Sequence, residues 1–145
     1  MKVIVQRSLN SSVSVNNKVV GKIDYGFVLL VGFKDTDTIE DVNTMINKII
    51  NLRIFDDENH KMNKSIIDIN GSILSISQFT LYAILNGRRP SYSKAMNSND
   101  AKKLYEIFND KLKEYVKVAT GIFGADMKVN IINDGPVSII LESGD

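Results

Sequence analysis

The chain has 145 residues, 43% of them hydrophobic and 24% charged, and its formal net charge is +1. This is the composition of a single globular domain, residues 1–145, and so small a charge excludes a bulk cationic field, so that any nucleic acid must be held by a local patch. The chain has no cysteine, which excludes thiol nucleophiles, disulfides and thiolate metal sites.

The first residues have a strand pattern rather than the apolar segment of a signal peptide, and no apolar run is long enough to cross a membrane. We therefore expect no membrane association and a cytoplasmic location. Residues 3–9 and 12–15 have strand patterns, and residues 18–23 follow as a third strand. Asn16 and Asn17 suit the two-residue turn before it, because asparagine tolerates positive φ.

Residues 25–33 are apolar on both faces, which predicts a central strand covered on both sides. A helix is predicted from Thr38, its candidate N-cap, to Arg53, with Asp41 at the third helical position. A second helix is predicted from Asp100 to Val116. Its expected inner face consists of Leu104, Ile107, Phe108, Leu112 and Tyr115.

Three further segments, residues 72–77, 126–132 and 137–142, have strand patterns. No glycine-rich phosphate loop follows any strand, which argues against a doubly wound nucleotide-binding fold. The order of elements predicts a mixed α/β domain. We expect folded-over β-sheets with two helices on one side, a three-layer β/β/α arrangement.

The single histidine, His60, lies in a polar stretch that is typical of an exposed turn, so it is a poor candidate for a catalytic base. An enzyme with this sequence must use hydroxyls, carboxylates, backbone groups or atoms of its substrate. We expect no metal ion and no cofactor.

Polar residues follow the strand of residues 72–77 at the point where the chain turns: Ser77, Gln78, Phe79 and Thr80. Backbone N–H groups that leave the sheet at such a place can form an oxyanion hole. The same residue types also suit a strand end with local side-chain hydrogen bonds, and both interpretations stay open.

Gly135 and Pro136 separate the last two predicted strands in a chain that has only two prolines. The pair suits a tight turn. It also suits a cis peptide bond, since X-Pro bonds adopt that form at modest cost, and such a loop could present two carbonyl groups to a ligand.

Taken together, six segments give the chain a full-length resemblance to the D-aminoacyl-tRNA deacylase family. They are residues 5–7, 51–55, 77–82, 87–92, 120–127 and 133–137, in the order that the family has them. The resemblance implies a homodimer that hydrolyses the ester bond of D-aminoacyl-tRNA and so proofreads chirality, with glycyl-tRNA mischarged on tRNA-Ala as a further substrate. It also implies that the bond between Gly135 and Pro136 is cis.

The resemblance further implies an active site at the subunit interface, where Ser77 to Thr80 of one subunit meet the Gly135–Pro136 loop of the other. Backbone N–H groups near Gln78, Phe79 and Thr80 would surround the ester carbonyl, and the ribose 2′-OH would assist in activating water. Because the sequence offers no base beside Thr80, we favour a positioning role for its hydroxyl over a nucleophilic one. The carbonyl groups of Gly135 and Pro136 would exclude an L side chain.

The remaining site residues are open to two interpretations each. Arg7 either holds the Gly135–Pro136 loop or is a surface arginine. Four residues, Phe123, Gly124, Ala125 and Met127, either line a pocket for the terminal adenosine of the tRNA acceptor end or pack in the core.

Two other functions remain possible from the sequence. One is a non-catalytic, dimeric RNA-binding module, which would present the cations Arg88, Arg89, Lys94, Lys102 and Lys103 to phosphates. The other is a structural dimerisation domain.

Overall fold

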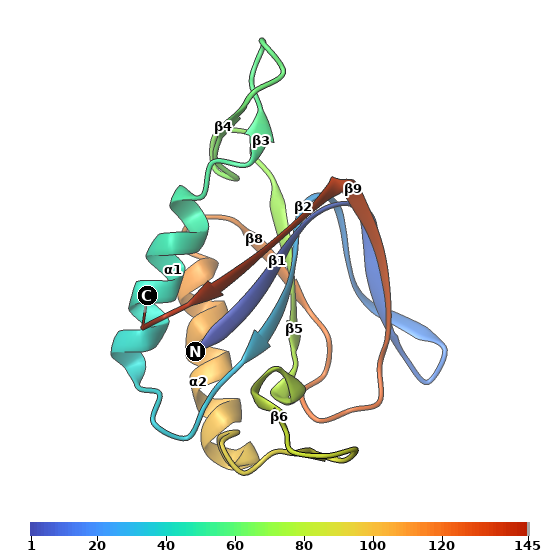
Figure 1. Ribbon diagram of the computed structural model, residues 1–145. Coiled ribbons are helices and arrows are strands. Elements are labelled where there is room, and N and C mark those ends of the chain that lie inside the picture. The colour runs from blue at the N-terminus through green and yellow to red at the C-terminus, as the bar shows by residue number, and fades with distance from the viewer. Residues whose placement is uncertain (145) are drawn as a thin grey trace.

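In a computed structural model, which describes residues 1–144, five strands form one sheet and two helices cover one of its faces (Figure 1). The strands, in spatial order, are β8 (Lys117–Thr120), β5 (Ser72–Ser77), β2 (Lys18–Gly32), β1 (Lys2–Val15) and β9 (Lys128–Glu142). β1 is antiparallel to β2 and β9, whereas β5 is parallel to β2 and β8. The helices are α1 (Ile39–Asn51) and α2 (Ser98–Leu112).

Two small hairpins extend from this body. One pairs β3 (Phe55–Asp56) with β4 (Met62–Lys64), and the other pairs β6 (Ile84–Leu85) with β7 (Pro90–Ser91). In Figure 1 they lie at opposite ends of the molecule. A short 3₁₀ helix, η1 (Phe79–Tyr82), directly follows β5.

The central strands contribute to two hydrophobic cores, because successive side chains of a strand point to opposite faces. Phe27 and Leu29 of β2 face α1 and α2 in the larger core, whereas Val28 belongs to the smaller core on the other side. The smaller core also contains Val13 and Ile23, which come from the far halves of β1 and β2. The sheet therefore folds over itself, and the predicted three-layer arrangement is confirmed.

The strands are longer than the sequence predicts. β1 and β2 each run through two predicted strands, and the turn at Asn16 and Asn17 is confirmed, with φ values of 50° and 64°. Residues 25–32 form a buried part of β2 in the middle of the sheet, as predicted. β9 runs through Gly135 and Pro136, so the prediction of a tight turn at this pair is wrong.

The helix predictions are confirmed in kind, with shifted ends. Thr38 is the N-cap of α1, and its backbone N–H donates to the carboxylate of Asp41 at 2.8 Å. α2 begins two residues earlier than predicted, because the side chain of Asn97 caps it by accepting from the N–H of Asp100. It ends at Leu112, so Tyr115 lies in the following turn and is 49% exposed; its predicted place on the inner face is wrong.

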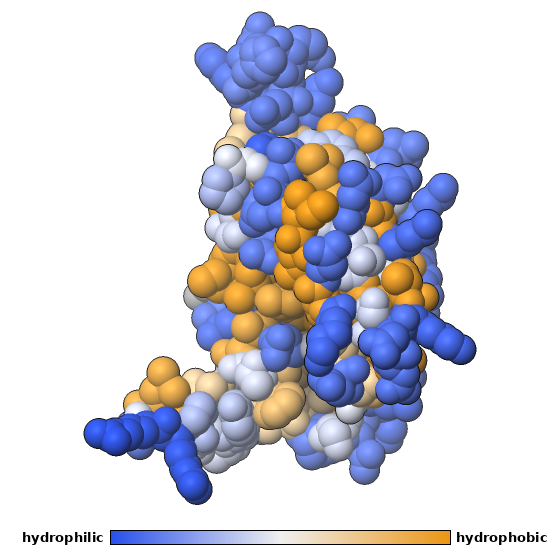
Figure 2. Space-filling view, turned by 90° about the vertical axis from the view of Figure 1, so that its right-hand side faces the viewer, coloured by the Kyte–Doolittle hydropathy of each residue, from blue (hydrophilic) through white to orange (hydrophobic). Residues whose placement is uncertain are grey.

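The face of the molecule opposite the helices is partly apolar. Figure 2 shows hydrophobic side chains gathered in the middle of this face, between hydrophilic margins. Large apolar side chains with high exposure include Ile140, at 66%, and Phe79, at 57%. Within residues 1–144, no helix is both long and apolar enough to span a membrane.

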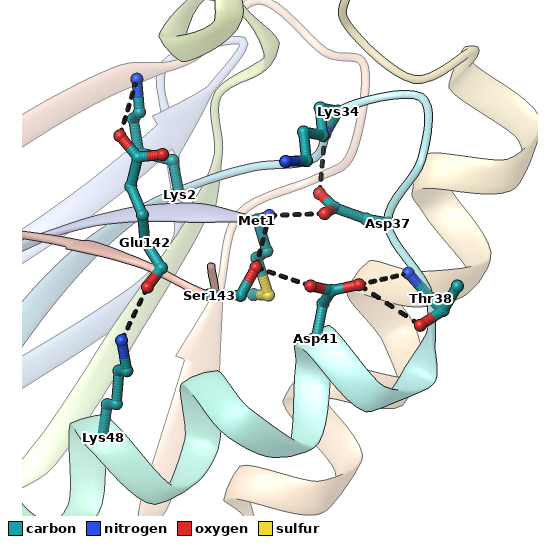
Figure 3. Close-up of polar contacts among 9 residues, drawn as sticks. All are labelled: Met1, Lys2, Lys34, Asp37, Thr38, Asp41, Lys48, Glu142 and Ser143. Carbon is teal, nitrogen blue, oxygen red and sulfur yellow. Dashed lines mark hydrogen bonds and ion pairs between the residues drawn. The ribbon is translucent and has the colours of Figure 1, made fainter. Parts of the chain in front are cut away.

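A buried ion pair joins the start of β1 to the loop before α1 (Figure 3). The ammonium group of Met1 donates to Oδ1 of Asp37 at 2.6 Å, and neither side chain is exposed. The same ammonium donates to Oγ of Ser143 at 2.9 Å, and the hydroxyl of Ser143 donates to Asp41 at 2.7 Å. This network connects the first strand, the first helix and the residue after the last strand.

Replacing Asp37 with Asn should lower the free energy of unfolding by about 3–5 kcal/mol, because it leaves the Met1 ammonium buried without a counter-charge. Urea denaturation measures the change. Asp35→Asn is the matched control, since Asp35 is exposed two residues away, and it should change stability by no more than about 0.5 kcal/mol. Equal effects of the two substitutions would show that the ion pair does not stabilise the fold.

Candidate active site

A cavity of about 650 Å³ lies where the parallel strands β2 and β5 end. Ligand sites in α/β sheets form at the carboxyl ends of parallel strands. The walls come from these strand ends, from residues 92–101 and from residues 123–129. The lining residues are Val31, Phe33, Ile76, Ser77, Gln78, Phe79, Tyr92, Ala95, Met96, Asn97, Ser98, Ala101, Phe123, Gly124, Ala125, Asp126, Met127 and Val129.

The segment after β5 turns away from the sheet at this cavity. The N–H of Gln78 donates to the carbonyl of Val31 at 2.7 Å, so this N–H is not available to a ligand. The next residues begin η1, and the first N–H groups of such a helix have no partner inside it. The N–H groups of Phe79 and Thr80 are therefore the ones that can form an oxyanion hole. Of these two residues, Phe79 lines the cavity.

Thr80 is half-buried next to the cavity lining, and its hydroxyl oxygen accepts a hydrogen bond from the side-chain amide of Gln78. The local side-chain bond that the sequence suggested is thus present, beside the free N–H groups. An amide cannot take a proton from a hydroxyl, so Gln78 holds the Thr80 side chain without activating it.

The second predicted group, Phe123, Gly124, Ala125 and Met127, also lines the cavity. The ring of Phe123 lies 5.8 Å from the ring of Tyr105, whose hydroxyl donates to the carbonyl of Ser75 at 2.7 Å. Met127 packs against the smaller core while lining the cavity. Phe123 and Met127 therefore pack against the two cores while they line the cavity.

An aromatic pair stands at the rim, which the sequence reasoning missed. The rings of Phe79 and Tyr92 meet edge to face, with centroids 4.9 Å apart. Aromatic side chains of this kind form platforms for nucleobases. Tyr92 lies in the segment of residues 87–92 that carries part of the family resemblance, and its aromatic character was the signal that could have identified it.

The cavity has no buried general base among the described residues. Its titratable lining side chains are Tyr92 and Asp126, and the side chain of Asp126 is 93% exposed. The polar groups that face a ligand are hydroxyls, amides and backbone groups. Such a site can orient a substrate and stabilise an oxyanion, but it needs a base from elsewhere.

Gly135 and Pro136 are exposed and lie away from this cavity in the same chain. Their peptide bond is cis, as the resemblance implies. Ser138 pairs with Gln6 and Asn133 pairs with Ser8, so four residues of β9 bulge opposite one residue of β1. Gln6 pairs with Val28 of β2. Val31, a lining residue of the cavity, lies three residues further along β2, and β1 separates this strand from β9.

Arg7 is the residue of β1 opposite this bulge, and it is only 7% exposed. Its Nε donates to the carbonyl of Asp134 at 2.9 Å, and its Nη1 donates to the carbonyl of Ile54 at 2.8 Å. Arg7 therefore holds the loop, and the prediction of a surface arginine is wrong. Burial raises the pKa of the nearby Tyr25 hydroxyl, and the carboxylate of Asp134 raises it further.

Two further features fix the bulge. The side chain of Asn133 accepts from the N–H of Val137 at 2.7 Å, which replaces a missing bond of the sheet. Gly135 has a φ of +140°, and a Cβ at this position would lie 2.7 Å from Cγ2 of Val137, so a larger residue is excluded.

Comparisons with known proteins agree on one family. The family model described as D-Tyr-tRNA(Tyr) deacylase matches residues 4–142. A protein named D-aminoacyl-tRNA deacylase from Sulfurihydrogenibium sp. (strain YO3AOP1) is 56% identical over 144 residues, which cover 99% of this chain and 98% of that protein. One of the same name from Clostridium novyi (strain NT) is 53% identical over 145 residues, covering 99% and 97%.

Two solved structures have the same fold. The "c-Myc DNA Unwinding Element Binding Protein" superposes with a TM-score of 0.94 at 40% identity, covering 98% of each chain. A probable eukaryotic D-amino acid tRNA deacylase superposes with a TM-score of 0.84, covering 97% of this chain and 98% of that one. At 17% identity the second likeness concerns the fold alone.

Replacing Arg7 with Met should lower the free energy of unfolding by about 2–4 kcal/mol, because the carbonyls of Ile54 and Asp134 lose their donors. Hydrogen exchange at the N–H of Val137 should accelerate more than in the rest of the sheet. Arg53→Met is the control: Arg53 also donates to a backbone carbonyl, that of Asn63, but it is exposed. The assignment of Arg7 as the residue that holds the loop fails if the two variants are equally stable.

Proposed function

The chain belongs to the D-Tyr-tRNA(Tyr) deacylase family, and we propose that it hydrolyses the ester bond between a D-amino acid and the terminal adenosine of tRNA. The observation that carries this proposal is the cavity where β5 ends, with free N–H groups and an aromatic rim but no buried base. The sequence match over the whole length supports the same reaction.

The terminal adenosine would occupy the part of the cavity formed by Phe123, Gly124, Ala125 and Met127. An adenine base offers a flat apolar face, which suits the rings and the thioether of this wall. The ester would then lie towards Ser77 and Phe79, on the other side of the cavity.

In the reaction, water adds to the ester carbonyl carbon and the carbonyl oxygen becomes an oxyanion. The N–H groups of Phe79 and Thr80 would stabilise this charge, since fixed donors are most effective where charge develops. The bond to the ribose oxygen then breaks, the proton from water goes to that oxygen, and the products are the free D-amino acid and tRNA. The ribose 2′-OH would assist in activating water, because the described residues offer no base there.

A second copy of the chain would discriminate between D- and L-aminoacyl substrates. Within one chain, the exposed Gly135–Pro136 bulge does not line the cavity, which supports a homodimer in which each bulge closes the partner's site. The exposed apolar side chains on the face opposite the helices support such an association.

Carbonyl groups held close to the substrate's Cα would exclude an L side chain by steric contact and by the cost of leaving them without a hydrogen bond. A D side chain would point away from these carbonyl groups, so the site would discriminate little between different D side chains. The enzyme would therefore accept many D-amino acids, and also glycine, including glycyl-tRNA mischarged on tRNA-Ala.

Deacylation of D-tyrosyl-tRNA and L-tyrosyl-tRNA, measured side by side, tests the proposed function. We expect the D ester to be hydrolysed at least about a hundredfold faster, since a steric and desolvation penalty of about 3 kcal/mol gives that ratio. Equal rates on both esters would refute chiral selection. RNA retention without turnover would instead identify a non-catalytic RNA-binding module, and neither binding nor turnover would leave a structural dimerisation domain.

Thr80→Ala should reduce kcat/KM by less than about tenfold, because its hydroxyl only positions the substrate. Replacing the 2′-OH of the terminal adenosine with hydrogen should reduce it by about a hundredfold or more, the usual size of an acid–base contribution. Thr80→Ser, which keeps the hydroxyl, is the control for packing. Trapping an acyl group on Thr80 by mass spectrometry would show that the hydroxyl is a nucleophile after all.

A further inference from the structure

The hairpin of β6 and β7 carries two adjacent arginines, Arg88 and Arg89, between its strands. Both are exposed, and Figure 1 shows this hairpin extending from the end of the molecule opposite β3 and β4. The chain continues from β7 into the wall of the cavity, since Tyr92 and Ala95 line it. The hairpin and the cavity rim are thus one continuous segment.

The positive charge of the chain is concentrated in this segment. Residues 84–103, which we name the basic segment, contain one carboxylate, Asp100, in a chain whose net charge is only +1. The rest of the chain is therefore net negative. The cations of the basic segment are Arg88, Arg89, Lys94, Lys102 and Lys103.

These cations have no partner among residues 1–144. All five are exposed, and within residues 1–144 none of their side chains forms an ion pair or a hydrogen bond. The backbone around Lys94 is anchored, because the N–H of Asp35 donates to the carbonyl of Lys94 at 3.0 Å and the N–H of Met96 donates to the carbonyl of Phe33. Positive charge without internal partners, on a fixed backbone, suits an external anion.

The opposite hairpin has the opposite charge. The stretch between β3 and β4 begins with Asp57 and Glu58, and Asp56 precedes them. The backbone N–H of Lys61 lowers the pKa of Asp57, and the side chain of Lys64 lowers that of Glu58, so both remain ionised at neutral pH. Lys64 is paired with Glu58 at 2.8 Å, so this end lacks the unpaired cluster of cations that the basic segment offers to a polyanion.

We propose that the basic segment binds the backbone phosphates of the tRNA acceptor end that directly precede the terminal adenosine. This inference rests on the proposed function, because that function places the terminal adenosine in the cavity that Tyr92 also lines. Tyr92 and Asn97 of the basic segment line the cavity, so an RNA strand that leaves the cavity along this segment brings its next phosphates to Lys94, Arg88 and Arg89. The contacts are to phosphates, so they add affinity for tRNA without reading its sequence.

The test compares two substrates that carry the same ester, D-tyrosyl-tRNA and D-tyrosyl-adenosine, of which the second has none of these phosphates. In the Arg88→Gln/Arg89→Gln variant, the ratio of kcat/KM for tRNA to kcat/KM for the adenosine ester should fall about tenfold or more, mainly through KM. The slope of log(kcat/KM) for tRNA against log[NaCl] should become shallower by about 1.4, or about 0.7 for each phosphate that is no longer neutralised.

Lys18→Gln/Lys61→Gln is the matched control, since it removes two exposed cations that lie outside the basic segment. It should leave the substrate ratio and the salt slope at their wild-type values. A ratio and a slope that are unchanged in the arginine variant would overturn this inference while the proposed function stands. Failure of the wild-type protein to hydrolyse either substrate would overturn the proposed function, and this inference with it.

A second pair of substitutions, Lys94→Gln/Lys103→Gln, tests whether the arginine variant acts through lost positive charge or through a changed hairpin structure. It removes two cations of the basic segment that lie outside the β6–β7 hairpin. The substrate ratio and the salt slope should move in the same direction as in the arginine variant. If only the arginine variant moved them, phosphate binding by the whole basic segment would be refuted.

Discussion

The neighbouring strands β1 and β2 must serve two hydrophobic cores at once, and the rest of the structure is arranged around this requirement. Alternate residues of β2, such as Phe27 and Val28, are buried on opposite faces. A sheet buried on both faces has to be covered twice, by the helices on one side and by its own folded-over half on the other. The cavity then forms where the inner strands end and neither cover continues.

Hydrogen bonding explains how backbone groups can be presented to a ligand at the bulge of β9. Four residues there have no regular partner on β1, and unpaired backbone groups are costly when they are buried. Arg7 and the side chain of Asn133 replace the missing bonds from within the protein. Because side chains hold the bulge from behind, the exposed Gly135 and Pro136 need no side-chain functional group of their own.

The sequence predicts the elements better than their extent. The cap of α1 depends on Thr38 and Asp41, and the turn depends on two asparagines, so local chemistry was sufficient for both. The continuity of β1 and β9 was not predictable, because Asn10 and Gly135 look like strand breakers until their neighbours in the sheet are known. Tyr115 was placed inward by helical spacing, which says nothing of where a helix ends.

Site residues followed the same rule. Ser77 to Phe79 and Phe123 to Met127 meet in one cavity, and the burial of Arg7 depends on the carbonyls of Ile54 and Asp134, which are distant from it in sequence. No local pattern could show that Val31 takes the N–H of Gln78. Only the tertiary contacts of Arg7 could therefore decide between its two interpretations, a residue that holds the loop or a surface arginine.

The pairing of β1 with β9 also fixes the order of events as the protein is made. Lys2 pairs with Glu142, so almost the whole chain must be synthesised before β9 can cover the second edge of β1. Until then, the ammonium of Met1 lacks Ser143 and the guanidinium of Arg7 lacks the carbonyl of Asp134. Contacts between such distant residues slow folding. A ribosome-bound chain that lacks β9 would therefore expose one edge of β1 and depend on rapid completion, or on a chaperone, to avoid association through that edge.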